Sequence, residues 1–230
     1  MLVNQDTTAT VNRAGGLRRR SLLGVAAVLV AMPLSGRAFA GASQAEASQA
    51  DAAATIKQFN AALLATMKAG GQTDFTHRFQ ALAPAVDKAF DLPDVLAISV
   101  GPSWASLSPE QQGRLLDAFG RYTVASYVAN FDSYSGQTFT VSAETRALDA
   151  GRVVVSSSIK PVNGDATALD YVMKQTQSGW KVVDVLAAGS ISRVAVQRSD
   201  FRHLLSKGGG DALVASLQRK AADLSGGEPA

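Results

Sequence analysis

Apolar residues recur at helical spacing near the start of the folded part of the chain. Ile56, Phe59, Leu63 and Met67 lie three or four residues apart, which places them on one face of a helix. The pair Gly70-Gly71 ends this helix. A second helix is predicted over residues 73–90, and Pro84 inside it is expected to kink or divide it.

Two further helices are predicted from the residues that begin them. Asp91 can cap a short helix with Pro93 in its first turn, and Gly101-Pro102 closes it. Ser108-Pro109-Glu110-Gln111 has the residues of a capping box, with proline at the first helical position. The helix that it opens is expected to run to about residue 133. Its predicted face contains Leu115, Phe119, Tyr122 and Ser126, with Leu116, Thr123 and Tyr127 adjacent.

Past Gly136 the period of the pattern changes from 3.6 to 2, which is typical of strands. A strand-like pattern of apolar residues occurs in four stretches: around Phe139 and Val141, and over residues 153–155, 169–173 and 180–183. Turn sequences separate these runs, the strongest of which is Asn163-Gly164-Asp165. The pattern predicts an antiparallel meander of about four strands. Two helical segments follow, about 190–207 and 210–222, divided by three glycines. Helices, then a sheet, then helices is an α+β order.

The first forty residues have the three parts of an export signal in order. They are a basic stretch at 18–20, an apolar run at 22–34, and Ala38-Phe39-Ala40 as a cleavage site. The sequence around Arg19-Arg20 also fits a twin-arginine signal, and a general secretory signal is the alternative. The apolar run is shorter than the roughly 20 residues that a membrane span needs. The alternative to a signal peptide is that this run forms a buried hydrophobic helix. We therefore expect a cleaved signal (1–40), a flexible lead (41–52), one domain (53–222) and a disordered tail (223–230) in a periplasmic protein.

Charge and cysteine content narrow the classes of partner. The chain has 22 Lys plus Arg and 19 Asp plus Glu. Without the first forty residues these become 17 and 18, which is a formal charge of −1. No remaining segment forms a basic stripe with interleaved aromatics, so nucleic acid is not an expected partner. The absence of cysteine excludes a disulfide framework.

Groups that could catalyse a reaction are few. His77 and His203 each lie beside an arginine on a predicted amphipathic helix, where a solvated face explains them. No zinc, redox or hydrolase motif occurs, so we predict no catalytic residue, metal or cofactor. Asp170 and Asp184 lie in predicted strands and could act as proton shuttles in an apolar cavity. The alternative is that they face solvent or cap a backbone end, and alternation with Tyr171 turns Asp170 outward.

The abundant apolar surface could form a solid core or line a cavity. An empty hole of about 800 Å³ would cost on the order of 20 kcal/mol, which exceeds the stability of a typical domain. Such a cavity must therefore be filled by a ligand or else collapse. A 16-carbon acyl chain leaving a membrane needs roughly 12 kcal/mol of compensating burial, which an enclosed slot supplies better than an exposed patch.

Two blocks of sequence resemble the MlaC or toluene-tolerance family of periplasmic lipid carriers. The first runs from Phe90-Asp91 through Gly101, Trp104 and the 108–112 capping segment to Tyr134. The second runs from Trp180 through Asp184-Val185, Gly189-Ser190-Ile191-Ser192 and residues 198–201 to 213–217. The ordered series, over about residues 50–222, carries the likeness. The residues around Lys220 and the twin-arginine-like start are more similar to the hopanoid-associated HpnM branch.

The resemblance implies a nuclear-transport-factor-like sheet with a deep apolar pocket for acyl chains, and no reaction. It implies as partners a phospholipid or hopanoid lipid, an inner-membrane ABC transporter or RND-type exporter, and an outer-membrane lipid donor or acceptor. The sequence departs from the family pattern at two places. Ala105 stands where many family members have arginine, and Val194-Ala195-Val196 stands where the family has a more polar run. The second departure concerns the pocket entrance and hence the preference for a head group.

The main hypothesis is a lipid carrier, and two alternatives stay open. We expect acyl chains to contact Leu115, Phe119, Tyr122, Phe139, Val141, Val153, Val155, Leu169, Tyr171, Met173, Val182, Phe201 and Leu205. The first alternative is a small isomerase or hydratase that uses Asp170, Tyr171 and Asp184. The second is a periplasmic adaptor that binds only protein and has no cavity.

Overall fold

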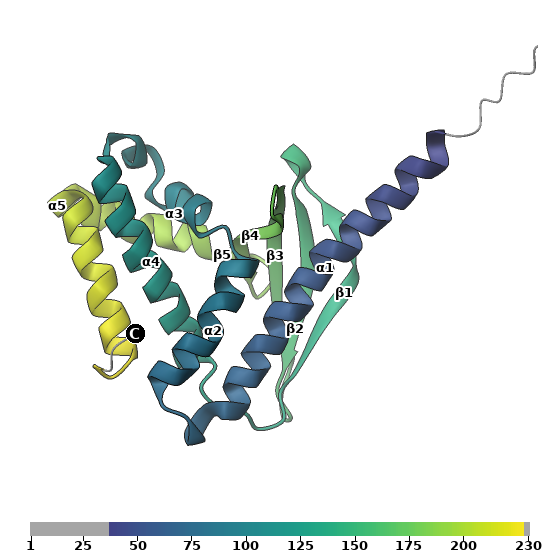
Figure 1. Ribbon diagram of the computed structural model, residues 1–230, viewed down its shortest axis with the longest axis horizontal. Coiled ribbons are helices and arrows are strands. Elements are labelled where there is room, and N and C mark those ends of the chain that lie inside the picture. The colour runs from purple at the N-terminus through teal and green to yellow at the C-terminus, as the bar shows by residue number, and fades with distance from the viewer. Residues whose placement is uncertain (1–36, 228–230) are drawn as a thin grey trace, which may run out of the picture.

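The computed structural model describes residues 37–227. It is an α+β protein whose elements follow the expected order of helices, sheet and helices (Figure 1). The signal motifs at 18–34 and the last three residues of the predicted tail lie outside the described part. Within it, residues 41–52 belong to the long helix α1 (Arg37–Ala69), and residues 223–224 still belong to the last helix.

The next three helices begin where local capping predicts. In α2 (Phe75–Ala89) the carboxylate of Asp74 accepts a hydrogen bond from the His77 amide, and the helix continues through Pro84 without being divided. Helix α3 (Leu92–Val100) is capped by Asp91, and a short 3-10 turn, Gly101–Ser106, follows it. Helix α4 (Pro109–Asn130) opens with the complete capping box of Ser108 and Gln111, and it ends three residues before the predicted limit.

The sheet has five strands, so the prediction of about four was one short. β1 (Thr138–Ala147), β2 (Val153–Lys160), β3 (Thr167–Thr176) and β4 (Gly179–Ala187) form the expected antiparallel meander. The fifth, β5 (Ile191–Ser192), has two residues that pair with Ala187 and Leu186. A two-residue strand leaves no alternation to detect, which is why the sequence pattern missed it.

The last helix, α5 (Arg193–Leu224), bends where the glycines lie. Gly208 (φ −155°, ψ 19°) and Gly209 (φ 63°, ψ −157°) have non-helical backbone angles, so two helical segments meet there as predicted. The positive φ of Gly209 favours glycine because a Cβ atom would be strained in that region. Arg114 of α4 pairs with Asp211 just beyond the bend at 2.6 Å, which holds the second segment against α4.

One hydrophobic core joins the helices to one face of the sheet. Figure 1 shows α1 crossing in front of the sheet, with α4 and α5 packed together on the other side of the molecule. Phe59 of α1 lies at the centre of this core, and its ring meets those of Phe90, Tyr127 and Tyr171 edge to face. Asn60 also donates a hydrogen bond to the Ser157 hydroxyl of β2 at 3.2 Å. A smaller cluster, around Val154, Val172 and Val183, is separate from this core.

Candidate functional site

A pocket of about 430 Å³ lies among α3, α4, the sheet and the start of α5. From the α3 and α4 regions it is lined by Phe90, Leu92, Val95, Phe119, Tyr122, Thr123, Ser126, Tyr127, Asn130 and Phe131. From the sheet and α5 it is lined by Leu169, Tyr171, Asp184, Val185, Ala187, Arg193, Val194 and Gln197. Most of these side chains are apolar, so the walls favour an apolar occupant.

The pocket depends on segments that are far apart in the sequence. Phe90 forms an isolated parallel bridge to Val182, and the Asp91 amide donates to the Val182 carbonyl oxygen at 2.9 Å. This pairing attaches the start of α3 to the edge of β4 beyond the short β5. It therefore places Leu92 and Val95 opposite the lining residues of α4.

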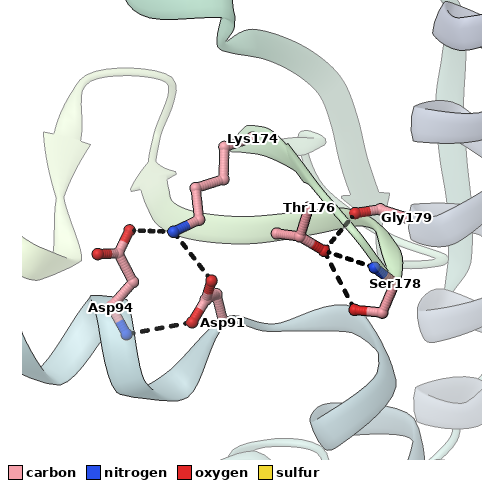
Figure 2. Close-up of polar contacts among 6 residues, drawn as sticks. All are labelled: Asp91, Asp94, Lys174, Thr176, Ser178 and Gly179. Atoms are coloured by element: carbon pink, nitrogen blue, oxygen red, sulfur yellow. Dashed lines mark hydrogen bonds and ion pairs between the residues drawn. The ribbon is translucent and has the colours of Figure 1, made fainter.

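A charged cluster fixes the same end of α3 from the sheet side. Figure 2 shows the Lys174 ammonium between two carboxylates, at 2.9 Å from Asp91 and 2.8 Å from Asp94. Hydrogen bonding to Asp94 is the main reason that the pKa of Lys174 is raised, while partial burial opposes the rise. In the turn that follows β3, the Thr176 hydroxyl donates to the Gly179 carbonyl at 2.8 Å. The cluster thus links strand β3 to the start of helix α3, and the turn contact links β3 to β4.

Polar side chains on α4 have their donors occupied within the helix. The hydroxyls of Thr123 and Ser126 donate to the carbonyls of Phe119 and Tyr122, at 2.8 and 2.7 Å. The Asn130 amide donates to the Ser126 carbonyl at 2.7 Å. These side chains therefore offer a ligand few free donors, although they line the pocket.

Asp184 lies in the pocket wall, where it caps the beginning of α5. Its carboxylate accepts hydrogen bonds from the Val194 amide at 3.1 Å, the Ser192 hydroxyl at 2.5 Å and its neighbour's amide at 2.8 Å. These contacts tie the Asp184 carboxylate to the loop before α5 and to the first turn of that helix. The capping alternative for Asp184 thus fits the structure better than proton transfer.

Asp170 and the two histidines lie away from the pocket wall, whereas Tyr171 lines it. Asp170 is paired with Ser156 and Leu186 in the sheet and is not a lining residue. The His77 side chain is 71% exposed and lies 2.8 Å from the Asp74 carboxylate, while His203 is also exposed. Residues 37–227 contain no cluster of three metal-binding side chains. In this part of the chain no helix is long and apolar enough to cross a membrane.

Two neutral phenols lie at the inner end of the pocket. Burial raises the pKa of Tyr171, whose side chain is 1% exposed, so it stays protonated at neutral pH. Burial also raises the pKa of Tyr127, Tyr171 adds to this effect, and the positive charge of Arg193 opposes it. The structure shows ring contacts but no hydrogen bond for either hydroxyl among the described residues.

Four of the predicted lipid-contacting residues line the pocket: Phe119, Tyr122, Leu169 and Tyr171. Five others are buried in the adjoining core: Leu115, Val155, Met173, Val182 and Phe201. The remaining four are partly buried against that core: Phe139, Val141, Val153 and Leu205. Whether any of the thirteen touches a lipid stays a prediction, but the structure brings only the first four together at the pocket.

Several lining residues were not among those predicted. On α4, Thr123, Ser126 and Asn130 recur at three- and four-residue spacing beside Phe119. Small or polar residues on the inward face of an amphipathic helix were the available signal, because a solid core would carry larger apolar ones there. No pattern within the local sequence could identify Phe90, Val185 or Arg193, since they reach the pocket through tertiary pairing.

Comparison with known proteins assigns the chain to a family. The model for the MlaC protein family matches residues 57–219. The chain belongs to the MlaC family. A solved structure of similar fold is a phospholipid-binding protein from Ralstonia solanacearum in complex with a phospholipid. It is 30% identical, the match covers 76% of this chain and 99% of that one, and the TM-score is 0.67. No curated protein sequence matches.

Membership of the MlaC family and the phospholipid-binding neighbour point to a binding or transport protein rather than an enzyme. They confirm the expected family and the α+β fold. The observations in the pocket agree, because its one carboxylate is engaged in capping and its histidines lie elsewhere. No comparison supports the narrower likeness to the HpnM branch.

Proposed function

We propose that this protein is a periplasmic carrier that holds the acyl chains of a phospholipid in the pocket and moves the lipid between membrane transport components. The observation that carries the proposal is the apolar pocket in a fold whose similar solved structure, from Ralstonia solanacearum, is a complex with a phospholipid. Its volume of about 430 Å³ lies within the range of roughly 300–1,000 Å³ that is usual for ligand sites.

The apolar walls of the pocket argue that an apolar ligand occupies it in use. The pocket is open to solvent on one side, so water fills it when no ligand is bound. Most of the lining offers this water no hydrogen bond, and the hydroxyl protons of Thr123 and Ser126 are already donated within α4. An acyl chain replaces this water and gains about 0.8 kcal/mol for each buried methylene group.

Transport between membranes extends the proposal beyond binding. The family resemblance supports an inner-membrane ABC transporter or RND-type exporter as one partner and an outer-membrane donor or acceptor as the other. Periplasmic location rests on the signal motifs at 18–40. It is tested by fractionating cells that express the chain with Arg19 and Arg20 replaced by lysine; retention in the cytoplasm supports twin-arginine export, and unchanged export favours the general secretory route.

Native mass spectrometry tests the binding proposal. Protein purified from the periplasm is expected to carry one lipid, which extraction and mass determination then identify as a phospholipid or as a hopanoid. Protein stripped of lipid should take up phospholipid from labelled vesicles and deliver it to unlabelled ones. A protein that is isolated without lipid and takes none up from vesicles would refute the proposal.

A further inference from the structure

The pocket has one charged group that is free to bind a ligand. Of the charged side chains that line it, Asp184 is engaged with the start of α5, and Arg193 is the other. Arg193 is the first residue of α5, and its side chain is exposed although it lines the pocket, so it lies at the rim. Within residues 37–227 it makes no hydrogen bond or ion pair.

The next turn of α5 adds a second donor at the rim. Gln197 lies four residues after Arg193 and therefore on the same helical face, and it also lines the pocket. Its side-chain amide lies 3.2 Å from the Ser99 hydroxyl, whose single proton is directed to the Val95 carbonyl at 2.7 Å. In either orientation of the amide, at least one of its two N–H groups remains for a ligand. A guanidinium and an amide on one face form a suitable pair of donors for an anion with several oxygens.

Deeper in the pocket, the phenols of Tyr127 and Tyr171 continue this set of donors. Tyr127, Tyr171 and Arg193 all line the same pocket. Neither tyrosine hydroxyl has a hydrogen-bond partner in the described part of the chain, so both can donate to a ligand. Arg193 is exposed whereas Tyr171 is 1% exposed, so the lining changes from a cation at the rim to a neutral donor within the pocket.

We propose that Arg193, assisted by the Gln197 amide, binds the phosphate group of a glycerophospholipid at the rim, and that the two phenols donate to its acyl-ester oxygens. The chemistry of such a lipid follows the same order: an anionic phosphate, neutral ester carbonyls, then hydrocarbon. This inference rests on the proposed function and names the side chains that recognise the phosphate and the esters of its lipid. It predicts selection of phosphate-bearing diacyl lipids over lipids that have the same chains and no phosphate.

A competition experiment measures this selection directly. Lipid-free protein is mixed with vesicles that contain equal amounts of phosphatidylglycerol and diacylglycerol with identical chains, and the bound lipids are quantified by native mass spectrometry. A hydrogen bond to a charged group favours the phosphate, but solvent at the rim weakens it, so we expect wild-type protein to prefer phosphatidylglycerol about tenfold. Arg193→Gln should abolish most of that preference, and Arg193→Lys should retain part of it.

Arg202→Gln is the matched control, because Arg202 is an exposed arginine of the same helix that does not line the pocket. It should keep the wild-type preference, and an equal loss in this variant would indicate general charge attraction and overturn the inference. Unchanged selection in Arg193→Gln would also overturn it while leaving lipid binding intact. If wild-type protein takes up neither lipid, the proposed function itself fails.

Inorganic phosphate distinguishes a lipid head group from a free anion as the source of the phosphate. Calorimetric titration of phosphate into lipid-free protein is expected to show no binding at millimolar concentration, because the apolar walls contribute only when acyl chains are present. Arg193-dependent binding of phosphate alone, without lipid selection, would show that the site serves a free anion and would refute the lipid assignment.

Discussion

Replacement of Ser126 by tryptophan should close the pocket while leaving the fold in place. Ser126 lies near the C-terminal end of α4, lines the pocket and is partly buried. Its hydroxyl donates only to the Tyr122 carbonyl of its own helix, so its loss leaves no distant group without a partner. The indole would therefore extend into space that a ligand is expected to use.

The size of the effect follows from the chain length that the indole displaces. Each acyl methylene kept out of the pocket loses about 0.8 kcal/mol of burial. If the ring displaces about three methylenes, the loss is roughly 2.4 kcal/mol, or about fiftyfold in affinity. The pocket of about 430 Å³ is large enough for the ring itself, so we expect little loss of stability.

Uptake of a fluorescent phospholipid by lipid-free protein measures the affinity, with circular dichroism and thermal melting as checks on folding. Arg121→Trp is the control, because Arg121 is an exposed residue of the same helix that does not line the pocket. It should bind lipid as the wild type does. A folded Ser126→Trp protein with wild-type affinity would refute the assignment of this pocket as the lipid site.

Three predictions concern stability. Phe59→Ala removes a ring that contacts three others and should cost about 3–5 kcal/mol in urea unfolding; a loss below about 1 kcal/mol would contradict its central place in the core. Ser108→Ala removes the α4 cap and should cost about 1 kcal/mol, whereas Ser103→Ala, in the preceding turn, should cost less. Lys174→Gln should cost at most about 1 kcal/mol at pH 7, because the cluster is partly exposed. The pKa of Lys174 in the folded protein is raised from 10.5, so its contribution to stability is present below pH 10.5 and is lost as the pH rises through the folded pKa. The melting temperatures of wild type and Lys174→Gln should therefore converge at high pH, and a constant difference between them would contradict this role of Lys174.

Local signals predicted most of the helices and the meander. The capping box at Ser108, the Asp91 cap and the glycines at 208–210 act through neighbours within a few residues, so the same contacts appear in the structure. The alternation over 138–187 likewise predicted strand order, since each strand pairs with the next along the chain. The two-residue β5 was missed because it is held by pairing with β4 and has no period of its own.

The amino-acid pattern alone thus determined the helices, the four long strands and most of the residues that face the core. It could not separate Met173, which is in the solid core, from Leu169, which lines the pocket, because the two are apolar residues of one strand. That division depends on how α3, α4 and α5 are placed over the sheet. The Phe90–Val182 bridge and the Asp184 cap set this placement through partners that no local pattern connects. Tertiary packing therefore decided where the helices leave space above the sheet, and it brought Arg193 to the rim.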